Sequence, residues 1–205
     1  MDIPSLVMWD LGGVLVSYDA DSQIKEMALL FGQPIARIKE ALRGQGGQGL
    51  LTRFECGRIS AEDYASSLEQ RFGRAVARDQ FWDAHNSSIW PNARAIELLK
   101  MVKARRPAVK HATVSDIDSR RLDHALRIVN FRFTVTLASF MVKNLKPGTD
   151  IYLKAMTLTG TLPVQCAYFD DQDPNVQAAR TLRIRGFRYK DDKQFESDLR
   201  ALGLL

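Results

Sequence analysis

The stretch LVMWDLGGVLV, residues 6–16, places an aspartate and two glycines directly after an apolar run. The run from Leu6 to Trp9 contains the β-branched Val7 and predicts a buried strand. Strands buried on both faces are nearly continuous apolar segments, so a lone carboxylate at the end of one needs a purpose. Asp10 is therefore the first candidate functional residue.

Length and composition limit what the chain can be. It has 205 residues, of which 45% are hydrophobic, enough for a substantial core in one domain or one domain with an insertion. The two cysteines, Cys56 and Cys166, lie far apart and outside any CxxC pattern. This spacing argues against a disulfide framework and against a zinc site.

The net charge of +5 raises the question of a nucleic-acid partner. The densest basic cluster runs from Arg180 to Lys190, over one predicted helix and the strand after it. A solvated surface, or one that attracts small anions, explains such a cluster, so we expect no nucleic-acid partner. No segment approaches the roughly 20 apolar residues that span a bilayer, and the N-terminus lacks a targeting pattern. We expect no membrane association and a cytoplasmic location.

Helical and strand patterns alternate after Trp90. Strands are predicted at 109–115, at 133–138, at 165–169 and around Phe187, and helices at 92–103, from Asp118, after Pro147 and from Asp173. This alternation predicts an α/β fold with a Rossmann-like, doubly wound parallel sheet. Ligands of such sheets bind at the carboxyl ends of the strands.

Strand patterns vanish between the first strand and this alternating region, over residues 18–89. Apolar residues recur there at helical spacing, in four stripes: Ile24, Met27, Ala28 and Phe31; Ile35, Ile38 and Leu42; Tyr64, Leu68 and Phe72; and Phe81, Trp82 and His85. We expect a core domain made of residues 1–17 and 90–205, with an all-helical insertion at 18–89.

The segment GQGGQG, residues 44–49, matches the GxGxxG pattern of dinucleotide-binding folds letter for letter. That pattern binds pyrophosphate when a strand precedes the glycines and a helix begins on them. The preceding IARIKEALR instead predicts a helix. We interpret the glycines as a flexible connection or hinge inside the insertion.

Polar side chains follow several predicted strands at the point where each strand ends. Asp10 ends the first strand, Ser115 the second, and the pair Asp170 and Asp171 the fourth. Lys146, in NLKPG, precedes the helix that follows the third strand. The carboxyl ends of parallel strands meet at one edge of a sheet, so we expect these groups to converge.

Such a set of groups suits phosphoryl chemistry. Carboxylates at close quarters repel one another, and a hard divalent cation such as Mg²⁺ neutralises them with oxygen ligands. A cation, a lysine, a serine hydroxyl and backbone amides together attract a phosphoryl dianion. An aspartate beside the phosphorus can attack it and form an aspartyl phosphate, which water then hydrolyses.

Four motifs, in this order and over essentially the whole chain, resemble those of the haloacid dehalogenase (HAD) superfamily. They are MWDLGGVLV, ATVSD, SFMVKNLKPGTDIY and AYFDDQDPNVQAA. Within the superfamily, DLGGV and FECGRISAEDY at 54–64 resemble the branch with a helical cap inserted after the first strand. Members of this branch act mainly on small phosphorylated metabolites, sugar phosphates among them.

The resemblance implies a role for each candidate residue. Asp10 would be the nucleophile and Lys146 its catalytic partner. The ligands of Mg²⁺ would be Asp10, the backbone carbonyl of Gly12, and one or both of Asp170 and Asp171. The phosphate would be held by Ser115, Asp116 and Lys146.

Gly12 departs from the majority pattern of the superfamily. Most relatives have a second aspartate there, which protonates the leaving group and deprotonates the attacking water. Such general acid and base catalysis contributes roughly a hundred- to ten-thousand-fold in rate. Its loss would affect alkoxide leaving groups most and anomeric or acyl phosphates least, so a sugar 1-phosphate is our hypothesis for the substrate.

Two further positions differ from glycines that are common in relatives. Lys143 stands three residues before the motif lysine, and Arg183 stands at the end of the last motif's helix. Asp116 and Asp118 also replace residues that are often neutral, and the Asp116 carboxylate would have to turn away from a phosphate.

Other polar residues have structural interpretations. Asp118, Asp150 and Asp173 are expected to cap helices or to lie in their first turns. The histidines lack metal-ligand spacing and are expected in the core or on the surface. Trp9 is expected to pack within the strand layer, and Asn175 to tether the acidic loop.

The sequence thus predicts a Mg²⁺-dependent phosphatase that acts on a small phosphorylated metabolite. An alternative is a catalytically weak or inactive relative that binds a phosphorylated ligand or a protein partner, which Gly12, Lys143 and Asp116 favour. A dehalogenase would use the same aspartate and lysine but no cation, which leaves Asp170 and Asp171 without a purpose.

Overall fold

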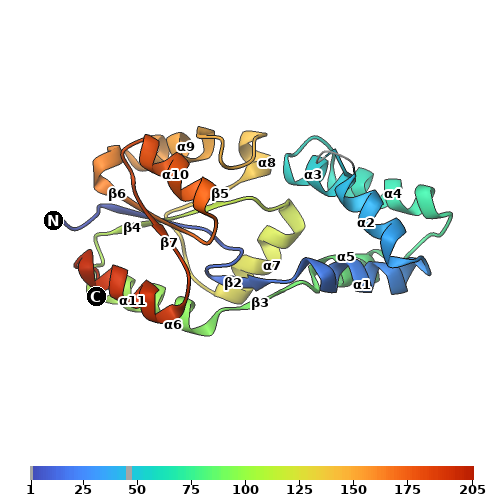
Figure 1. The fold of residues 1–205 in the computed structure, drawn as a ribbon, viewed down its shortest axis with the longest axis horizontal. Helices are drawn as coiled ribbons and strands as arrows, with labels where there is room; N and C mark the ends of the chain where they lie inside the picture. Colours follow the sequence, from blue (N-terminus) through green and yellow to red (C-terminus); the bar gives the residue numbers. More distant parts are fainter. Residues whose placement is uncertain (1, 45–47) are drawn as a thin grey trace.

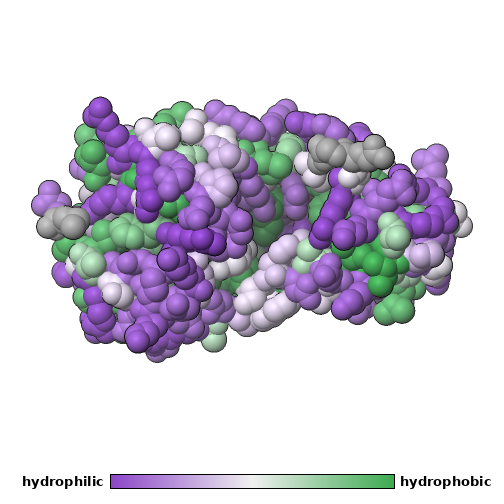
Figure 2. Space-filling view, viewed as in Figure 1, coloured by the Kyte–Doolittle hydropathy of each residue, from purple (hydrophilic) through white to green (hydrophobic). Residues whose placement is uncertain are grey.

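The computed structural model describes residues 2–44 and 48–205, which form two lobes (Figure 1). One lobe contains a sheet flanked by helices, and we call it the sheet lobe. The other contains helices α1 to α5, and we call it the helical lobe. Hydrophilic residues cover much of the face in Figure 2, and a narrower waist joins the lobes. Residues 45–47 of the predicted glycine connection lie outside the described part.

Within the described chain, five parallel strands form the sheet in the order β5-β4-β1-β6-β7. The strands are β1 (Leu6–Trp9), β4 (Lys110–Ser115), β5 (Val135–Ala138), β6 (Cys166–Asp170) and β7 (Arg185–Arg188). The central strand is β1, and all four of its residues are fully buried. The predicted α/β fold with a Rossmann-like parallel sheet is confirmed.

Helices cover both faces of this sheet (Figure 1). Val7 and Trp9 of β1 pack with α6 (Ala93–Arg105), α7 (Ser119–Val129) and α11 (Asp192–Ala201). Leu6 and Met8 face the opposite side, toward α9 (Asp150–Thr159) and α10 (Asp173–Thr181). Successive strand residues alternate between the two faces of the sheet, so the four apolar residues of β1 pack against the helices on both faces.

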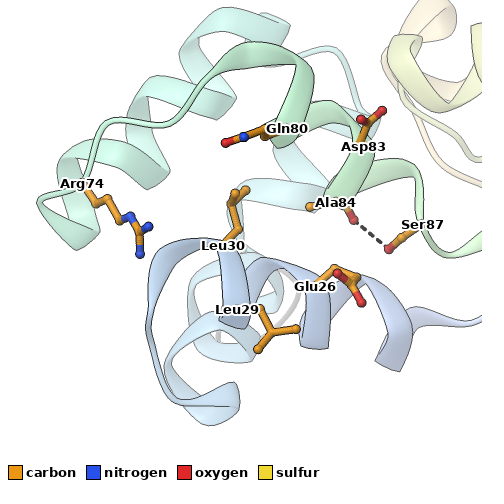
Figure 3. A pocket seen from close by; sticks show the side chains of 8 residues that line it. All are labelled: Glu26, Leu29, Leu30, Arg74, Gln80, Asp83, Ala84 and Ser87. Carbon is orange, nitrogen blue, oxygen red and sulfur yellow. Dashed lines mark hydrogen bonds between the residues drawn. The ribbon is translucent and has the colours of Figure 1, made fainter.

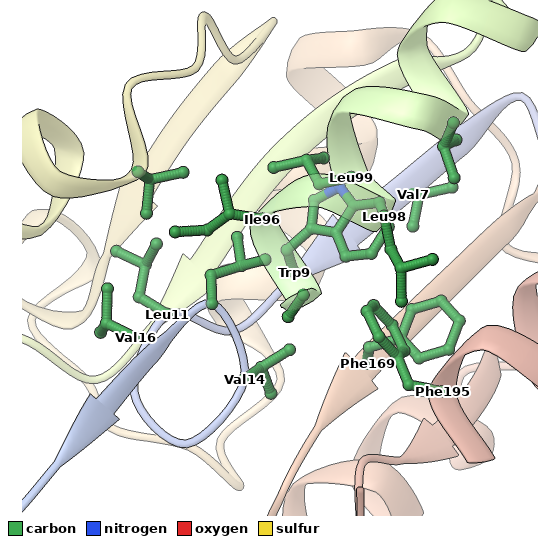
Figure 4. Packing of buried hydrophobic residues seen from close by; sticks show 14 of the residues in the cluster. Val7, Trp9, Leu11, Val14, Val16, Ile96, Leu98, Leu99, Phe169 and Phe195 are labelled. Carbon is green, nitrogen blue, oxygen red and sulfur yellow. The ribbon is translucent and has the colours of Figure 1, made fainter. Parts of the chain in front are cut away.

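Trp9 lies in the middle of the first of these layers (Figure 4). Its ring stacks on Phe169 at 5.4 Å between centroids and meets Phe195 of α11 edge-on at 5.9 Å. Its indole nitrogen donates to Nδ1 of His111 over 3.2 Å. Trp9 therefore packs in the core, as predicted. Helix α11 was not predicted from the sequence. Its segment is rich in charged residues, and its buried residues are Phe195 and Leu199, too few to form an apolar stripe.

The helical lobe has a hydrophobic core of its own. Its helices are α1 (Ala20–Phe31), α2 (Ile35–Arg43), α3 (Leu50–Glu55), α4 (Ala61–Phe72) and α5 (Arg78–Asn86). The predicted stripe of α1 is buried in full. Ile35 is wrongly predicted as buried: it begins α2 and is 52% exposed, while Ala41 takes its place in the core. The six-residue α3 is too short to show a periodic pattern.

Two short strands connect the lobes. They are β2 (Val16–Tyr18) and β3 (Ile89–Pro91), which pair antiparallel with Ser17 opposite Trp90. The expected boundaries at 17/18 and 89/90 fall within them. Each has three residues, which is too few for an alternating pattern to predict. Every helix in the described part of the chain is too short or too polar to cross a membrane.

Candidate active site

The predicted polar residues gather where the central strands end. Asp10 follows β1, and its backbone N–H donates to Phe169 O over 3.0 Å. This hydrogen bond extends the pairing of β1 with β6 by one residue. Ser115 is the last residue of β4, and Asp170 is the last residue of β6. All three are buried. The parallel register thus brings together residues that are far apart in the sequence.

Lys146 is buried and lies at the centre of the group. Its Nζ is 2.9 Å from Asp10 Oδ2 and 2.7 Å from Asp170 Oδ2, and it also donates to Val114 O and to the hydroxyl of Tyr168. Burial alone would lower the pKa of Lys146, but the carboxylates of Asp10 and Asp170 outweigh burial and raise it. Lys146 is therefore a permanent ammonium ion.

Asp10 has donors at both of its carboxylate oxygens. Its Oδ1 accepts from the backbone N–H of Leu11 over 2.7 Å, and its Oδ2 faces Lys146. Burial raises the pKa of Asp10 to about 8, against the lowering effects of Lys146 and of a hydrogen bond with Ser115. The nearby Asp170 raises it further. A cation beside these carboxylates would lower the pKa of Asp10 and favour the ionised form, which is the nucleophilic one.

Asp170 is held by several donors besides Lys146. Gln172 N donates to Oδ1 over 2.7 Å, Asn175 Nδ2 lies 3.1 Å from both oxygens, and the Tyr168 hydroxyl donates to Oδ2. Burial would raise the pKa of Asp170, but Lys146 and the hydrogen bonds from Tyr168 and Gln172 lower it. Asp170 is therefore ionised, and Asn175 tethers the acidic loop as predicted.

The second glycine after Asp10 makes room for Asp171. Gly13 has a φ of +74°, and a Cβ on it would lie 2.5 Å from Cγ of Asp171. One carboxylate oxygen each of Asp10, Asp170 and Asp171 then lies within 4.8 Å of the other two. Three clustered carboxylate oxygens suit a hard cation such as Mg²⁺, so the residues present fit the expected metal.

Asp116 engages the loop that carries Lys146. Both of its carboxylate oxygens accept from the backbone N–H of Lys146, over 3.0 and 3.1 Å. Burial raises the pKa of Asp116, and Lys146 opposes that shift. The carboxylate therefore positions Lys146, so any contact of Asp116 with a phosphate is expected from its backbone. Lys143 is exposed.

A cavity of about 110 Å³ opens beside this group. It is lined by Gly12, Val16, Tyr18, Glu55, Ile89, Ser115, Asp116, Ile117 and Arg121. A Cβ placed on Gly12 would have no heavy atom within 4 Å, so Gly12 borders open space. The sheet lobe supplies one side of the cavity, and α3 with the two connecting strands supplies the other.

Glu55 and Arg121 are cavity residues that sequence reasoning missed. Arg121 Nη1 lies 3.3 Å from Glu55 Oε1, and the guanidinium lies over the Tyr18 ring at 5.3 Å. The signal that could have found Arg121 is its place on the apolar face of α7, four residues before Ala125 and eight before Val129. Glu55 has no comparable signal, because its place depends on how α3 packs.

A buried hydrogen bond links the lobes near the cavity. His85 Nε2 of α5 lies 2.9 Å from Oδ2 of Asp118, the N-cap of α7, and both side chains are fully buried. Burial lowers the pKa of His85, while His85 and Arg121 outweigh burial and lower the pKa of Asp118 to about 2. A neutral His85 therefore donates from Nε2 to an ionised Asp118. The Nδ1 atom of His85 accepts a hydrogen bond from Gln23 Nε2. His85 is a core residue, as predicted.

A second groove, of about 540 Å³, lies on the helical lobe between α1 and α5 (Figure 3). It is lined by Glu26, Leu29, Leu30, Arg74, Gln80, Asp83, Ala84 and Ser87. None of these residues belongs to the carboxylate and lysine group, and the groove has no buried ion pair among its lining residues. We therefore place the chemistry in the smaller cavity.

Known proteins with similar sequences or structures share this fold. No protein-family model matches the chain. The chain is 28% identical over 171 residues to fructose-1-phosphate phosphatase YqaB of Escherichia coli K12, covering 82% of this chain and 78% of that protein. A predicted HAD-like family hydrolase from Porphyromonas gingivalis superposes with a TM-score of 0.81 at 22% identity, over 98% of both chains.

HAD family enzyme BT-2542 of Bacteroides thetaiotaomicron, in complex with magnesium and inorganic phosphate, gives a TM-score of 0.76 at 20% identity. That match covers 91% of this chain and 94% of the other. The similarity to a phosphatase in sequence and to HAD proteins in structure agrees with the four motifs. The resemblance inferred from the sequence is confirmed, and the chain has the fold of the HAD superfamily.

Proposed function

We propose that the protein is a Mg²⁺-dependent phosphatase that hydrolyses small phosphorylated metabolites through an aspartyl phosphate on Asp10. The observation that carries the proposal is the buried pairing of Asp10 with Lys146, beside the acidic pair and a cavity that ends at Ser115. The relatives add support, since one is a fructose-1-phosphate phosphatase and another holds magnesium and inorganic phosphate. The helical lobe would act as a cap that excludes bulk water.

The side chains can each take a part in the reaction. The substrate phosphoryl group would lie between Asp10 and the cavity, with the Ser115 hydroxyl donating to one of its oxygens. Asp10 attacks the phosphorus, and Lys146 stabilises the charge that spreads over the phosphoryl oxygens. Magnesium held by Asp10, Asp170, Asp171 and the carbonyl of Gly12 would supply further neutralisation of that charge.

The leaving group and the cavity size narrow the substrate class. Gly12 supplies no proton, which favours a sugar 1-phosphate that carries its phosphate on the anomeric carbon, because that oxygen leaves easily. A cavity of about 110 Å³ between the lobes suits a small metabolite.

The test is release of inorganic phosphate from a panel of aryl, acyl and sugar phosphates, with Mg²⁺ and with chelator. We expect turnover that needs the metal and that Asp10→Asn abolishes. Asp123→Asn is the matched control, because Asp123 is exposed on α7 and should leave turnover unchanged. A folded wild-type protein that binds Mg²⁺ without releasing phosphate would instead support the alternative of a binding protein.

A further inference from the structure

The proposed function leaves one requirement open, namely a proton for the leaving oxygen. Gly12 cannot provide it, and the space around its missing side chain is empty of heavy atoms to 4 Å. Among the groups that line the cavity, Arg121 stays charged and Asp116 is engaged by Lys146 N. Burial raises the pKa of Tyr18. Glu55 is the remaining carboxyl group of the cavity wall.

We propose that Glu55, on helix α3 of the helical lobe, is the general acid and base of this site, in the role that Gly12 cannot fill. The inference rests on the proposed phosphatase function. It assigns a catalytic residue to the helical lobe, where Glu55 lines the same cavity as Gly12 and Ser115 of the sheet lobe.

The backbone of Glu55 is fixed against the sheet lobe. The Ser139 hydroxyl, in helix α8 (Ser139–Val142), donates to Glu55 O over 2.6 Å. Gly57, two residues later, has a φ of +64°, and a Cβ there would lie 2.6 Å from Phe140 O. These close contacts hold the end of α3 at the cavity in this closed arrangement.

The side chain of Glu55 is oriented by Arg121. Oε1 lies 3.3 Å from Arg121 Nη1, and Arg121 is itself fixed by the ring of Tyr18 and by the ionised Asp118 at 3.7 Å. Within the described chain, no hydrogen bond engages Oε2 of Glu55. One oxygen is thus held in place, and the other is available to a ligand in the cavity.

The surroundings suit a group that exchanges protons near neutral pH. Burial raises the pKa of Glu55 to about 7, Arg121 lowers it, and Asp118 and Asp116 raise it. The charged or titratable groups near Glu55 on the packed elements are Arg121, Asp118, Asp116, Tyr18, Tyr64 and Cys56. A carboxyl group with a pKa close to the working pH is suited to both donation and acceptance of protons.

The two half-reactions balance with Glu55 in this role. Asp10 forms a bond to phosphorus, the bond to the leaving oxygen breaks, and that oxygen takes the proton of Glu55 and departs as an alcohol. The Glu55 carboxylate then accepts a proton from water, whose oxygen attacks the aspartyl phosphate. The bond between phosphorus and Asp10 breaks, inorganic phosphate leaves, and both carboxyl groups return to their starting states.

The test is Glu55→Gln, measured on phosphate esters whose leaving groups span a range of pKa values. We expect kcat/KM, which reports the first half-reaction, to fall by about a hundred- to ten-thousand-fold for alkyl phosphates and far less for p-nitrophenyl phosphate. The limb of the kcat/KM profile near pH 7 should disappear. Glu26→Gln, an exposed position on α1, is the matched control and should change neither property.

A Glu55→Gln enzyme with the leaving-group dependence of the wild type would overturn the proposal, whatever its absolute rate. This outcome is distinct from failure of the proposed function, in which the wild type releases no phosphate and Asp10→Asn changes nothing. Gly12→Asp in the Glu55→Gln background is a second test. The open space at Gly12 should accept the aspartate, and we expect at least about tenfold recovery on alkyl phosphates.

Discussion

Lys143 and Arg183 have positive φ angles of 56° and 66°, a left-handed conformation that costs most residues roughly 1–2 kcal/mol. Glycine adopts it without that cost, although it loses more entropy on folding. We expect Lys143→Gly and Arg183→Gly each to raise the free energy of unfolding by about 0.5–1 kcal/mol in urea titrations. Lys154→Gly, at an exposed position within α9, should instead lower it by about 1 kcal/mol. A fall for either of the first two would contradict the strain argument.

Gly13 matters for a different reason, which is its contact with Asp171. Alanine there would strain the backbone and overlap the Asp171 carboxylate. We expect Gly13→Ala to weaken Mg²⁺ binding, so that half-maximal turnover needs about 10–100-fold more Mg²⁺. Gly160→Ala is the matched control, because its φ of +63° imposes similar strain with no heavy atom within 4 Å. Equal Mg²⁺ dependence in the two variants would show that Gly13 does not position Asp171.

Single residues differ in how far the sequence could predict them. Asp10, Ser115 and Asp170 follow apolar runs, so the end of each strand could be located and their convergence inferred from the parallel sheet. Glu55 and Arg121 meet because α3 packs beside α7, a contact between lobes that no local pattern encodes. The positive φ values at Lys143 and Arg183 agree with the glycines that the family resemblance implies at these positions.

At the scale of elements, helices α5 and α7 are joined by the buried pair of His85 and Asp118. Asp118 has a pKa of about 2 in the folded protein, below its ordinary value of 3.8. A carboxyl group with a lowered pKa stabilises the fold above its ordinary pKa, and that contribution is lost as the pH falls toward the folded value. The link between the lobes should therefore weaken in acid.

Asp118→Asn tests this link, because asparagine also caps helices well. At pH 7 we expect it to lower the free energy of unfolding by about 2 kcal/mol, since it removes a buried charge-assisted hydrogen bond. The difference from wild type should shrink as the pH falls from about 5 toward 2. Chemical denaturation across this range measures it, with Asp123→Asn as the exposed control on the same helix. A difference that stays constant with pH would exclude this role for the Asp118 charge.

The missed elements have physical reasons: α11 buries two apolar residues, too few to show a helical stripe, and the others are too short. Strands β2 and β3 have three residues each, and α3 has six, so none repeats a pattern. These three elements lie at the junction of the lobes, and each contributes to the cavity wall. The sequence could therefore locate the side of the site that carries Asp10 but not the side that faces it.

At the scale of the whole molecule, the distance between the lobes sets the size of the cavity. Ile117 lines it from the loop before α7 and is 5% exposed, and Ile89 lines it from β3. If the lobes close around substrate as they do here, the wall residues limit the leaving group. The residues at the junction of the lobes, rather than the carboxylates, would then select substrates by size.

Ile117→Ala should enlarge the cavity without touching Asp10 or Lys146. We expect the ratio of kcat/KM for a hexose phosphate to that for a triose phosphate to rise by about tenfold, the scale of selectivity that a few methylene groups provide. Ile96→Ala is the matched control, because Ile96 is similarly buried on α6 but lies outside the cavity. Both changes cost stability, roughly 2–5 kcal/mol, so rates are compared well below the unfolding temperature of each variant. An equal change of the ratio in both variants would mean that the closed cavity does not select substrate size.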